Sequence, residues 1–433
     1  MLRSSLIVTF LTLCASLLGF VVQLLLAQRF GVGVEVDAYL FSLSLPMFLA
    51  GLISAILSFN LTPRLVSVKN DVHFHRNLIS TLVIGVSIIA LALMILMGAG
   101  MTLLSQYLLP TESPIRYYSE LQKLIIISCA VGGSQIVQGC VSAILISERK
   151  YIHSALIALT PYVGMLALLL VMDPSAGIMS VVIGMLLGTL TGVIIGVALL
   201  RALIFPLLWK GANWGELLKL VSSSFYTTLA MSCFSAYAAV DAFWGPWAGD
   251  GVLATLGYAQ RLVIAVGNLA VAGPSAILVP HLVEYLRDGN YRGFMNLMRR
   301  TFLLVGAISL MVAVFIGLFA ADIVSLLFGY GEFDQEHVIQ VADTITNMAP
   351  GMVAMLLSVI GFRVLFCFES VHKQIALLGL GWTFGYFVAS SLAHEKGAAG
   401  IALGYSAIWI LVFCMTAILI YKKTRTFNVS DTH

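Results

Sequence analysis

The sequence predicts an all-α polytopic membrane protein with about twelve transmembrane helices in two parallel six-helix repeats. Three observations support this fold class: apolar residues make up 60% of the 433 positions, charged residues make up only 10%, and the polar gaps between apolar runs are short. Soluble domains carry about 25% charged residues, so a soluble fold is excluded. The apolar residues suffice for about twelve crossings of about 20 residues each.

Each apolar run of 18 or more residues is interpreted as one spanning helix. The first six spans are predicted at 5–28, 36–62, 78–109, 121–146, 152–172 and 176–205, and the second six at 215–245, 252–280, 299–328, 338–366, 373–393 and 398–421. The first run is longer than the apolar core of a secretion signal and is kept as a span. Residues 1–210 therefore form the predicted N-terminal bundle and residues 211–433 the C-terminal bundle.

The basic residues predict the orientation. With the N-terminus inside, the inner segments hold 18 of the 23 Lys and Arg residues, and the remainder are Arg29, Arg116, Lys123, Arg261 and Lys396. Because short cytoplasmic loops are enriched in Lys and Arg, both termini are predicted to be cytoplasmic.

Two short strings repeat at half the chain length. Thr62-Pro63-Arg64-Leu65-Val66 matches Val279-Pro280-His281-Leu282-Val283, and Glu148 after the fourth helix matches Glu369 after the tenth. Each pair follows an even number of helices, so the two halves have the same orientation. Transporters built from such parallel repeats bind substrate between the halves and rock one half against the other.

Several function classes are excluded. The sequence contains no G-x-x-x-x-G-K-[ST] phosphate loop, so the chain encodes no nucleotide-driven pump. The six cysteines lie singly in apolar runs without metal-ligand spacing, which predicts neither a metal site nor a cofactor. A net charge of +3 is too small to indicate a nucleic-acid partner.

Two charged residues lie inside predicted spans, where charge costs about 2.5–3.5 kcal/mol on insertion scales. Asp241 lies in the seventh helix and Arg261 lies nine residues into the eighth, roughly 13 Å along its axis. Arg261 is interpreted either as an anion site that Asp241 balances when empty, or as half of a permanent ion pair with Asp241. Gln23, opposite Asp241 in the repeat, either lines the same path or bonds to a neighbouring helix.

Other charges lie at helix ends. Asp37 flanks the first outer turn and is interpreted as an interface anchor. Glu148 and Arg149, with Glu369 and Lys373 in the second half, form matching cytoplasmic ends. These four residues are predicted either to close an inner gate by salt bridges between the halves or to be solvated loop charges.

Motifs along the whole chain resemble the MurJ/MviN branch of the MOP (multidrug, oligosaccharidyl-lipid, polysaccharide) exporter superfamily. The strings that carry the resemblance are Phe30-Gly31-Val32-Gly33, Val36-Asp37-Ala38-Tyr39-Leu40, Leu45-Pro46, Gly257-Tyr258-Ala259-Gln260-Arg261-Leu262, Leu278-Val279-Pro280-His281-Leu282, and Leu326-Leu327-Phe328-Gly329-Tyr330-Gly331-Glu332-Phe333-Asp334. The resemblance implies two six-helix bundles around a V-shaped cavity in the bacterial cytoplasmic membrane. It further implies alternating-access export of an undecaprenyl-pyrophosphate-linked glycan, with Arg261 as a basic cavity residue and Asp37 as the acidic residue opening the second helix.

The sequence also departs from this family. Where lipid II flippases carry arginines in the first two helices, it has Ser16, Val22, Ala50 and Gly51, and it ends after twelve predicted helices. An exopolysaccharide, capsule or O-antigen precursor is therefore expected in preference to lipid II.

The resemblance leaves three alternatives open. The first is an ion-coupled multidrug or small-cation antiporter of the same superfamily, the second a membrane glycan polymerase or ligase, and the third a structural scaffold. A flippase needs no catalytic residues and no bound cofactor. Its expected partners are the glycan lipid, membrane lipids and glycan polymerase machinery, with coupling to membrane potential, H⁺ or Na⁺.

Overall fold

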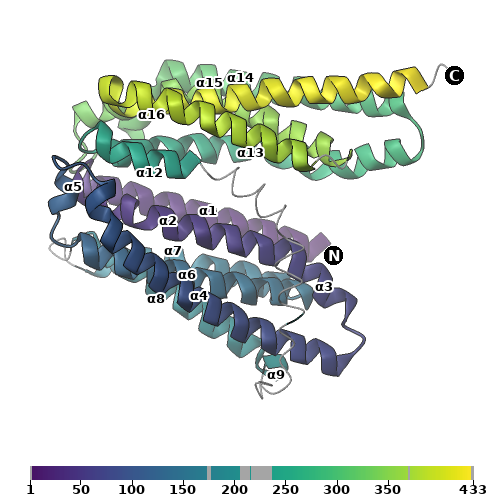
Figure 1. Cartoon of the computed structure of the whole chain (residues 1–433), viewed down its shortest axis with the longest axis horizontal. Coiled ribbons are helices and arrows are strands. Elements are labelled where there is room, and N and C mark those ends of the chain that lie inside the picture. Colours follow the sequence, from purple (N-terminus) through teal and green to yellow (C-terminus); the bar gives the residue numbers. More distant parts are fainter. Residues whose placement is uncertain (1, 173–176, 205–214, 216–236, 369–370, 431–433) are drawn as a thin grey trace. The chain divides into compact units, whose positions relative to one another are not determined.

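The computed structural model describes residues 2–172, 177–204, 215, 237–368 and 371–430. It divides the chain into two compact units, Met1–Ser232 and Cys233–His433. The described residues form helices and connecting turns and contain no strand (Figure 1). The predicted bundle boundary at residues 210/211 falls outside the described residues and stays a prediction.

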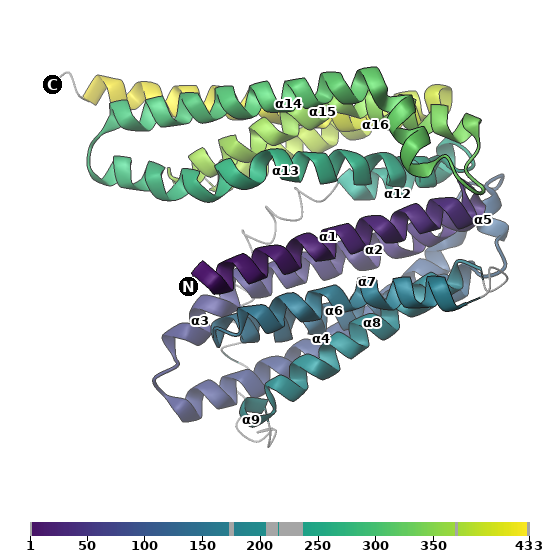
Figure 2. The same ribbon diagram turned by 180° about the vertical axis from the view of Figure 1, so that it is seen from behind.

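The described residues of the first unit form six long helices and several short segments. In chain order they are α1 (Leu2–Phe30), α2 (Val34–Ile56), the π-helical turn η1 (Leu57–Leu61), α3 (Thr62–Ser67), α4 (Val72–Leu108), α5 (Pro114–Tyr117), α6 (Leu121–Ser147), α7 (Tyr151–Val171), α8 (Met179–Leu199) and α9 (Arg201–Ile204). Figures 1 and 2 show α1, α2, α6 and α7 lying side by side from both directions. The long helices bury apolar residues against one another, which stabilises the unit.

In the second unit, the described residues form fewer segments, most of them longer. They are α12 (Tyr237–Ala248), α13 (Val252–Arg287), α14 (Tyr291–Phe328), α15 (Gln335–Phe366) and α16 (Val371–Ser430). Gly397 interrupts α16 with φ +54° and ψ −131°, a backbone conformation that favours glycine. The two arms of α16 fold back on each other at this point. They pack so closely that a Cβ on Gly404 would lie 2.9 Å from the Cβ of Ala389.

The predicted fold class is confirmed. Nine helices of the described part are long and apolar enough to cross a membrane, and the one at Lys373–Thr424 contains the reversal at Gly397. Some predicted boundaries are wrong, however: α4 begins at Val72 and α14 at Tyr291, whereas the predicted spans begin at 78 and 299. These helices start earlier because Asp71 and Asn290 cap them, each accepting a hydrogen bond from a backbone N–H three residues on.

The two units share one packing pattern. In the first unit α1 packs on α7, α2 and α4 pack on α6, and α6 packs on α8. In the second unit α12 packs on α16, and α13 and α14 pack on α15, which also packs on α16. Helices at corresponding positions therefore make corresponding contacts, as expected for an internal repeat.

Small residues bring the paired helices together in both units. A Cβ on Gly164 of α7 would lie 2.2 Å from the carbonyl oxygen of Gly184 on α8, and a Cβ on Gly385 would lie 3.0 Å from the carbonyl oxygen of Gly404. Helices in a membrane associate mainly through such close packing, because lipid tails are as apolar as the side chains. These glycines therefore allow α7 to approach α8, and the two arms of α16 to approach each other.

Candidate functional site

A buried acidic side chain connects α12 and α13 in the second unit. Asp241 on α12 is 8% exposed, and its carboxylate accepts a short hydrogen bond from the side-chain amide of Gln260 on α13. Among the described residues, no cation lies within ion-pair distance of Asp241, so the expected pairing with Arg261 is not formed. The reason is helical geometry: consecutive residues point about 100° apart, so Gln260 faces α12 and Arg261 does not.

Arg261 has an exposed side chain on α13, nine residues after the helix begins at Val252. It forms no ion pair or hydrogen bond with any residue that the structure describes. A guanidinium group in an apolar helix faces a cavity or an opposite charge in preference to lipid. Arg261 is therefore the candidate group for an anionic ligand in this unit.

Gln23 and Asp37 lie in the first unit. Gln23 is 6% exposed on α1, and Asp37 is fully buried in the first turn of α2. An acidic side chain at a helix N-terminus is stabilised by the partial positive charge of the exposed backbone N–H groups there. A role for either residue in substrate binding stays a prediction.

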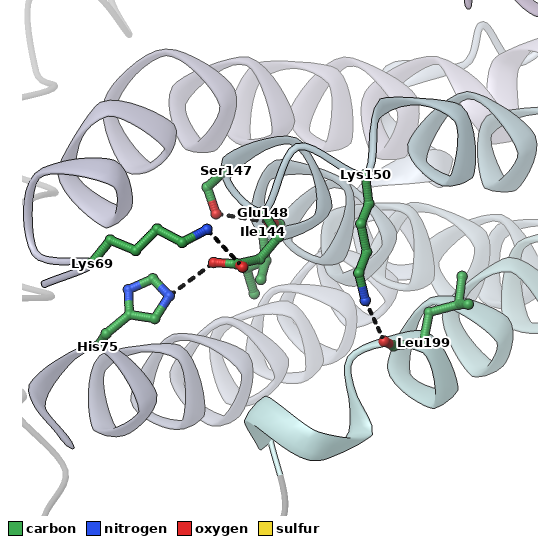
Figure 3. Close-up of polar contacts among 7 residues, drawn as sticks. All are labelled: Lys69, His75, Ile144, Ser147, Glu148, Lys150 and Leu199. Carbon is green, nitrogen blue, oxygen red and sulfur yellow. Dashed lines mark hydrogen bonds and ion pairs between the residues drawn. The ribbon is translucent and has the colours of Figure 1, made fainter. Parts of the chain in front are cut away.

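Glu148, predicted at the inner gate, makes two bonds within its own unit (Figure 3). Its carboxylate accepts hydrogen bonds from Lys69 Nζ and from His75 Nε2, both at 2.9 Å. Burial acts to raise the pKa of the Glu148 carboxyl, but the hydrogen bonds and charges of Lys69 and His75 outweigh burial, so the pKa lies below its usual value. Glu148 is therefore an ionised clamp between the start of α4 and the end of α6.

The residues after Glu148 complete this helix end. Arg149 has φ +60°, Lys150 N–H donates to Leu145 O at 2.8 Å, and Arg149 N–H donates to Ile146 O at 3.0 Å. These two bonds form a Schellman motif, in which the left-handed residue is usually glycine. Lys150 Nζ also donates to Leu199 O at 3.0 Å, so the same turn holds the end of α8 (Figure 3).

The other predicted gate residues lie in the second half. Lys373 is exposed near the start of α16, whereas Glu369 lies outside the described residues. A gate between the halves therefore stays a prediction. Sequence reasoning missed Lys69 and His75 as partners of Glu148, because a bond across more than 70 positions leaves no local signal.

The string from Phe328 to Asp334 builds the turn between α14 and α15. Phe333 is buried against Tyr258 and Phe328, with ring centroids 5.7 and 5.8 Å away. Asp334 caps α15 by accepting a hydrogen bond from His337 N–H at 2.9 Å. This part of the family resemblance is therefore explained by folding, with no ligand required.

Sequence reasoning also missed Asp343 on α15. Its side chain is exposed, and it lies eight residues after the helix begins. The predicted span at 338–366 placed Asp343 near the start of the helix, where a charge is unremarkable.

Comparisons with known proteins agree with this fold. The family model described as lipid II flippase MurJ matches residues 26–431. A probable lipid II flippase MurJ of Rhizobium meliloti (strain 1021) is 27% identical over 179 residues, which is 40% of this chain and 33% of the relative. The matched segment thus spans about a third of that relative's length.

Two solved structures are similar in fold. A lipid II flippase MurJ in an inward closed conformation superimposes with a TM-score of 0.83 at 18% identity, covering 98% of this chain and 90% of that one. An inward-facing multidrug resistance MATE family transporter of the MOP superfamily gives 0.80 at 14% identity, covering 96% and 95%. Because the family model covers nearly the whole chain, this protein belongs to the lipid II flippase MurJ family.

Proposed function

We propose that this protein is a flippase that moves an undecaprenyl-pyrophosphate-linked glycan precursor across the bacterial cytoplasmic membrane by alternating access. Membership of the MurJ family supports this substrate class. The observation that carries the proposal is the exposed Arg261 side chain on α13, since its neighbour Asp241 is held by Gln260. The guanidinium group of Arg261 is therefore available to bind a phosphate.

Arg261 would hold the headgroup phosphate, because a guanidinium group donates two parallel hydrogen bonds to phosphate oxygens. Gln23 and Asp37 in the first unit, and Asp241 in the second, are proposed as further polar contacts. We infer that outward movement of a negative headgroup is favoured by an inside-negative potential, at about 2.3 kcal/mol per charge per 100 mV.

We further propose that both termini are cytoplasmic, because the positive-inside rule places the ends of α6 and α13 there. In this orientation Glu148, Arg149, Glu369 and Lys373 would form the inner gate. An engineered cysteine at Ser4 and one at Lys423 would test the orientation by reaction with an impermeant maleimide from each side of the membrane.

Transport in proteoliposomes tests the proposed function. Purified protein is reconstituted with a fluorescent undecaprenyl-pyrophosphate oligosaccharide, with lipid II, or with a cationic dye, and a membrane potential, a proton gradient or a sodium gradient is imposed. Wild-type protein is expected to translocate at least one of the two glycan lipids. Arg261→Ala is expected to abolish translocation, and Arg299→Ala, an exposed arginine near the start of α14, serves as the matched control.

Each result has a distinct meaning. Translocation of lipid II alone would make this a lipid II flippase, and translocation of the other oligosaccharide alone would favour an exopolysaccharide, capsule or O-antigen pathway. Gradient-driven dye movement without glycan translocation would overturn the proposal in favour of a drug antiporter. Normal glycan transport by Arg261→Ala would overturn the site assignment.

A further inference from the structure

The described part of helix α15 has a single exposed stripe, and most of the side chains on that stripe are polar. The residues that are exposed between its first residue and its proline are Glu336, Ile339, Gln340, Asp343, Thr346 and Pro350, and Asn347 is partly exposed beside them. A spacing of three or four residues places them on one face of the helix. The opposite face is buried, as shown by Val341, Ile345 and Met352.

The neighbouring helix α14 shows the opposite pattern. Between Thr301 and Phe319, its exposed side chains are all apolar: Leu303, Leu304, Ala307, Leu310, Met311, Val314, Phe315, Leu318 and Phe319. Such a surface suits contact with lipid tails. Beyond Phe319, α14 exposes one carboxylate, Asp322, six residues before its end at Phe328. The exposed face of α15 differs because it carries a run of polar side chains from Glu336 to Asn347, and such a run suits contact with water or a polar ligand better than contact with lipid tails.

The polar stripe runs deep along α15. Asp343 lies eight residues and Pro350 fifteen residues after Gln335, about 12 and 22 Å along the axis. Asp343 lies within the segment Gln335–Leu365, which is long and apolar enough to cross a membrane. A carboxylate inside a spanning segment is costly and is tolerated where it faces a water-filled cavity. We propose that Asp343, Thr346 and Asn347, here called the α15 stripe, line the transport path and bind hydroxyl groups of the glycan headgroup. This inference rests on the proposed function for the identity of its ligand.

The chemistry of the α15 stripe suits sugar hydroxyls. The Asp343 carboxylate makes no hydrogen bond or ion pair with the described residues, so its oxygens are available as acceptors. Thr346 Oγ1 donates to Ala342 O at 2.9 Å and Asn347 Nδ2 donates to Asp343 O at 2.8 Å, so these groups also present acceptor oxygens. Acceptors bind hydroxyl donors and repel phosphate, which leaves the phosphate to Arg261 on α13, the helix that packs on α15.

The backbone beneath the stripe is held in place. Pro350 has no N–H to donate, and Ser406 on the second arm of α16 bridges the interrupted turn. Its hydroxyl donates to Asn347 O at 2.6 Å and accepts from Gly351 N–H at 3.1 Å. A Cβ on Gly351 would lie 2.6 Å from Ser406 Cα, so only glycine allows this approach. The stripe therefore stands on a rigid segment, as a binding surface requires.

Water accessibility tests the path assignment independently of transport. In a variant with all six native cysteines replaced, Thr346→Cys and Asn347→Cys are compared with Leu310→Cys on the apolar face of α14. Maleimide reacts with a hydrated thiolate, so the stripe cysteines are expected to react at least about tenfold faster than Leu310→Cys in proteoliposomes. Equal and slow reaction at all three positions would overturn the proposal.

Binding tests the sugar assignment. The dissociation constants of an undecaprenyl-pyrophosphate oligosaccharide and of sugar-free undecaprenyl pyrophosphate are measured with the protein in nanodiscs. Asp343→Ala is expected to weaken binding of the oligosaccharide lipid about tenfold, as for loss of one charged hydrogen bond, and not to weaken binding of the sugar-free lipid. Asp343→Asn, which keeps one acceptor oxygen, is expected to lose less, whereas Arg261→Ala should weaken both lipids.

The outcomes separate this inference from the proposed function. Equal weakening of both lipids by Asp343→Ala, or no weakening of either, would overturn the sugar assignment alone. Failure of the wild-type protein to bind either lipid would overturn the proposed function, and sugar recognition with it.

Discussion

The side chains of His75 and Glu148 form a hydrogen bond of 2.9 Å between the first turns of α4 and the end of α6. Because the pKa of Glu148 is lowered, its carboxylate is ionised at neutral pH and only accepts hydrogen bonds. His75 Nε2 must therefore carry the proton and act as donor. The same end of α6 makes two further contacts: Glu148 accepts a hydrogen bond from Lys69, and Lys150 donates one to Leu199 O at the end of α8.

The first prediction concerns this clamp. Glu148→Gln should destabilise the protein by about 1–3 kcal/mol, because His75 is 5% exposed and would lose its charged acceptor. Thermal unfolding of the purified protein in detergent measures the effect. Glu120→Gln is the matched control, since the ion pair of Glu120 with the exposed Lys123 is long, at 4.0 Å, and its loss should change stability little. Equal melting temperatures for Glu148→Gln and the wild type would refute the clamp.

The same pair predicts a pH dependence. A carboxyl group whose pKa is lowered on folding contributes stability above its unfolded value, here 4.5, and loses that contribution as pH falls through the folded value. The melting-temperature difference between wild type and Glu148→Gln should therefore be constant near neutral pH and shrink below pH 4.5. A difference that grows on acidification would contradict this sign.

Two helix ends offer a matched test of backbone strain. Arg149 has φ +60° after α6, and Gly289 has φ +66° in the same motif after α13, where Asn290 N–H donates to Tyr285 O at 2.9 Å. Arg149→Gly should stabilise by about 0.5–1 kcal/mol, and Gly289→Ala should destabilise by about 1 kcal/mol. Both are read from melting curves, and a stability loss in Arg149→Gly would show that its side chain contributes more than its backbone costs.

Hydropathy predicted the helices because each span must bury its own backbone hydrogen bonds in lipid, and that requirement leaves long apolar runs. It missed the first turns of α4 and α14, since those turns are polar and are set by Asp71 and Asn290. Capping residues read together with hydropathy would have found both starts.

Side-chain partners were less predictable. Asp241 and Arg261 share a comparable depth, which suggested an ion pair, but depth does not fix the direction in which a side chain points. Gln260 and Arg261 are consecutive on α13 and point about 100° apart, so only one of them can face Asp241, and it is Gln260. Asp343 was overlooked because it lies near the start of its predicted span, and the sequence does not show that it shares an exposed helix face with Thr346 and Asn347.

A double-mutant cycle tests the Asp241–Gln260 bond. Gln260→Leu should destabilise by about 1–3 kcal/mol, because it leaves a buried carboxylate without its donor. Adding Asp241→Leu should restore most of that stability, since replacing both partners with apolar groups removes the unsatisfied group. Thermal unfolding of the two single variants and the double variant gives the coupling. Additive losses would mean that the two side chains act independently.

The close approach of α7 and α8 gives the last prediction. A Cβ on Gly184 would lie 2.6 Å from the carbonyl oxygen of Gly164. This oxygen belongs to the backbone of α7, so it can move away only if α7 and α8 separate. Gly184→Ala should therefore destabilise the protein by about 1–3 kcal/mol through overpacking.

Gly100→Ala on α4 is the control, because no atom lies within 4 Å of the added methyl group and alanine favours helix. The two substitutions add the same atoms to the same kind of residue, so a lower melting temperature in Gly184→Ala alone assigns the loss to helix contact. Equal melting temperatures would instead mean that α7 and α8 separate at little cost, and that the first unit relies on α6, on which both helices pack, to hold them.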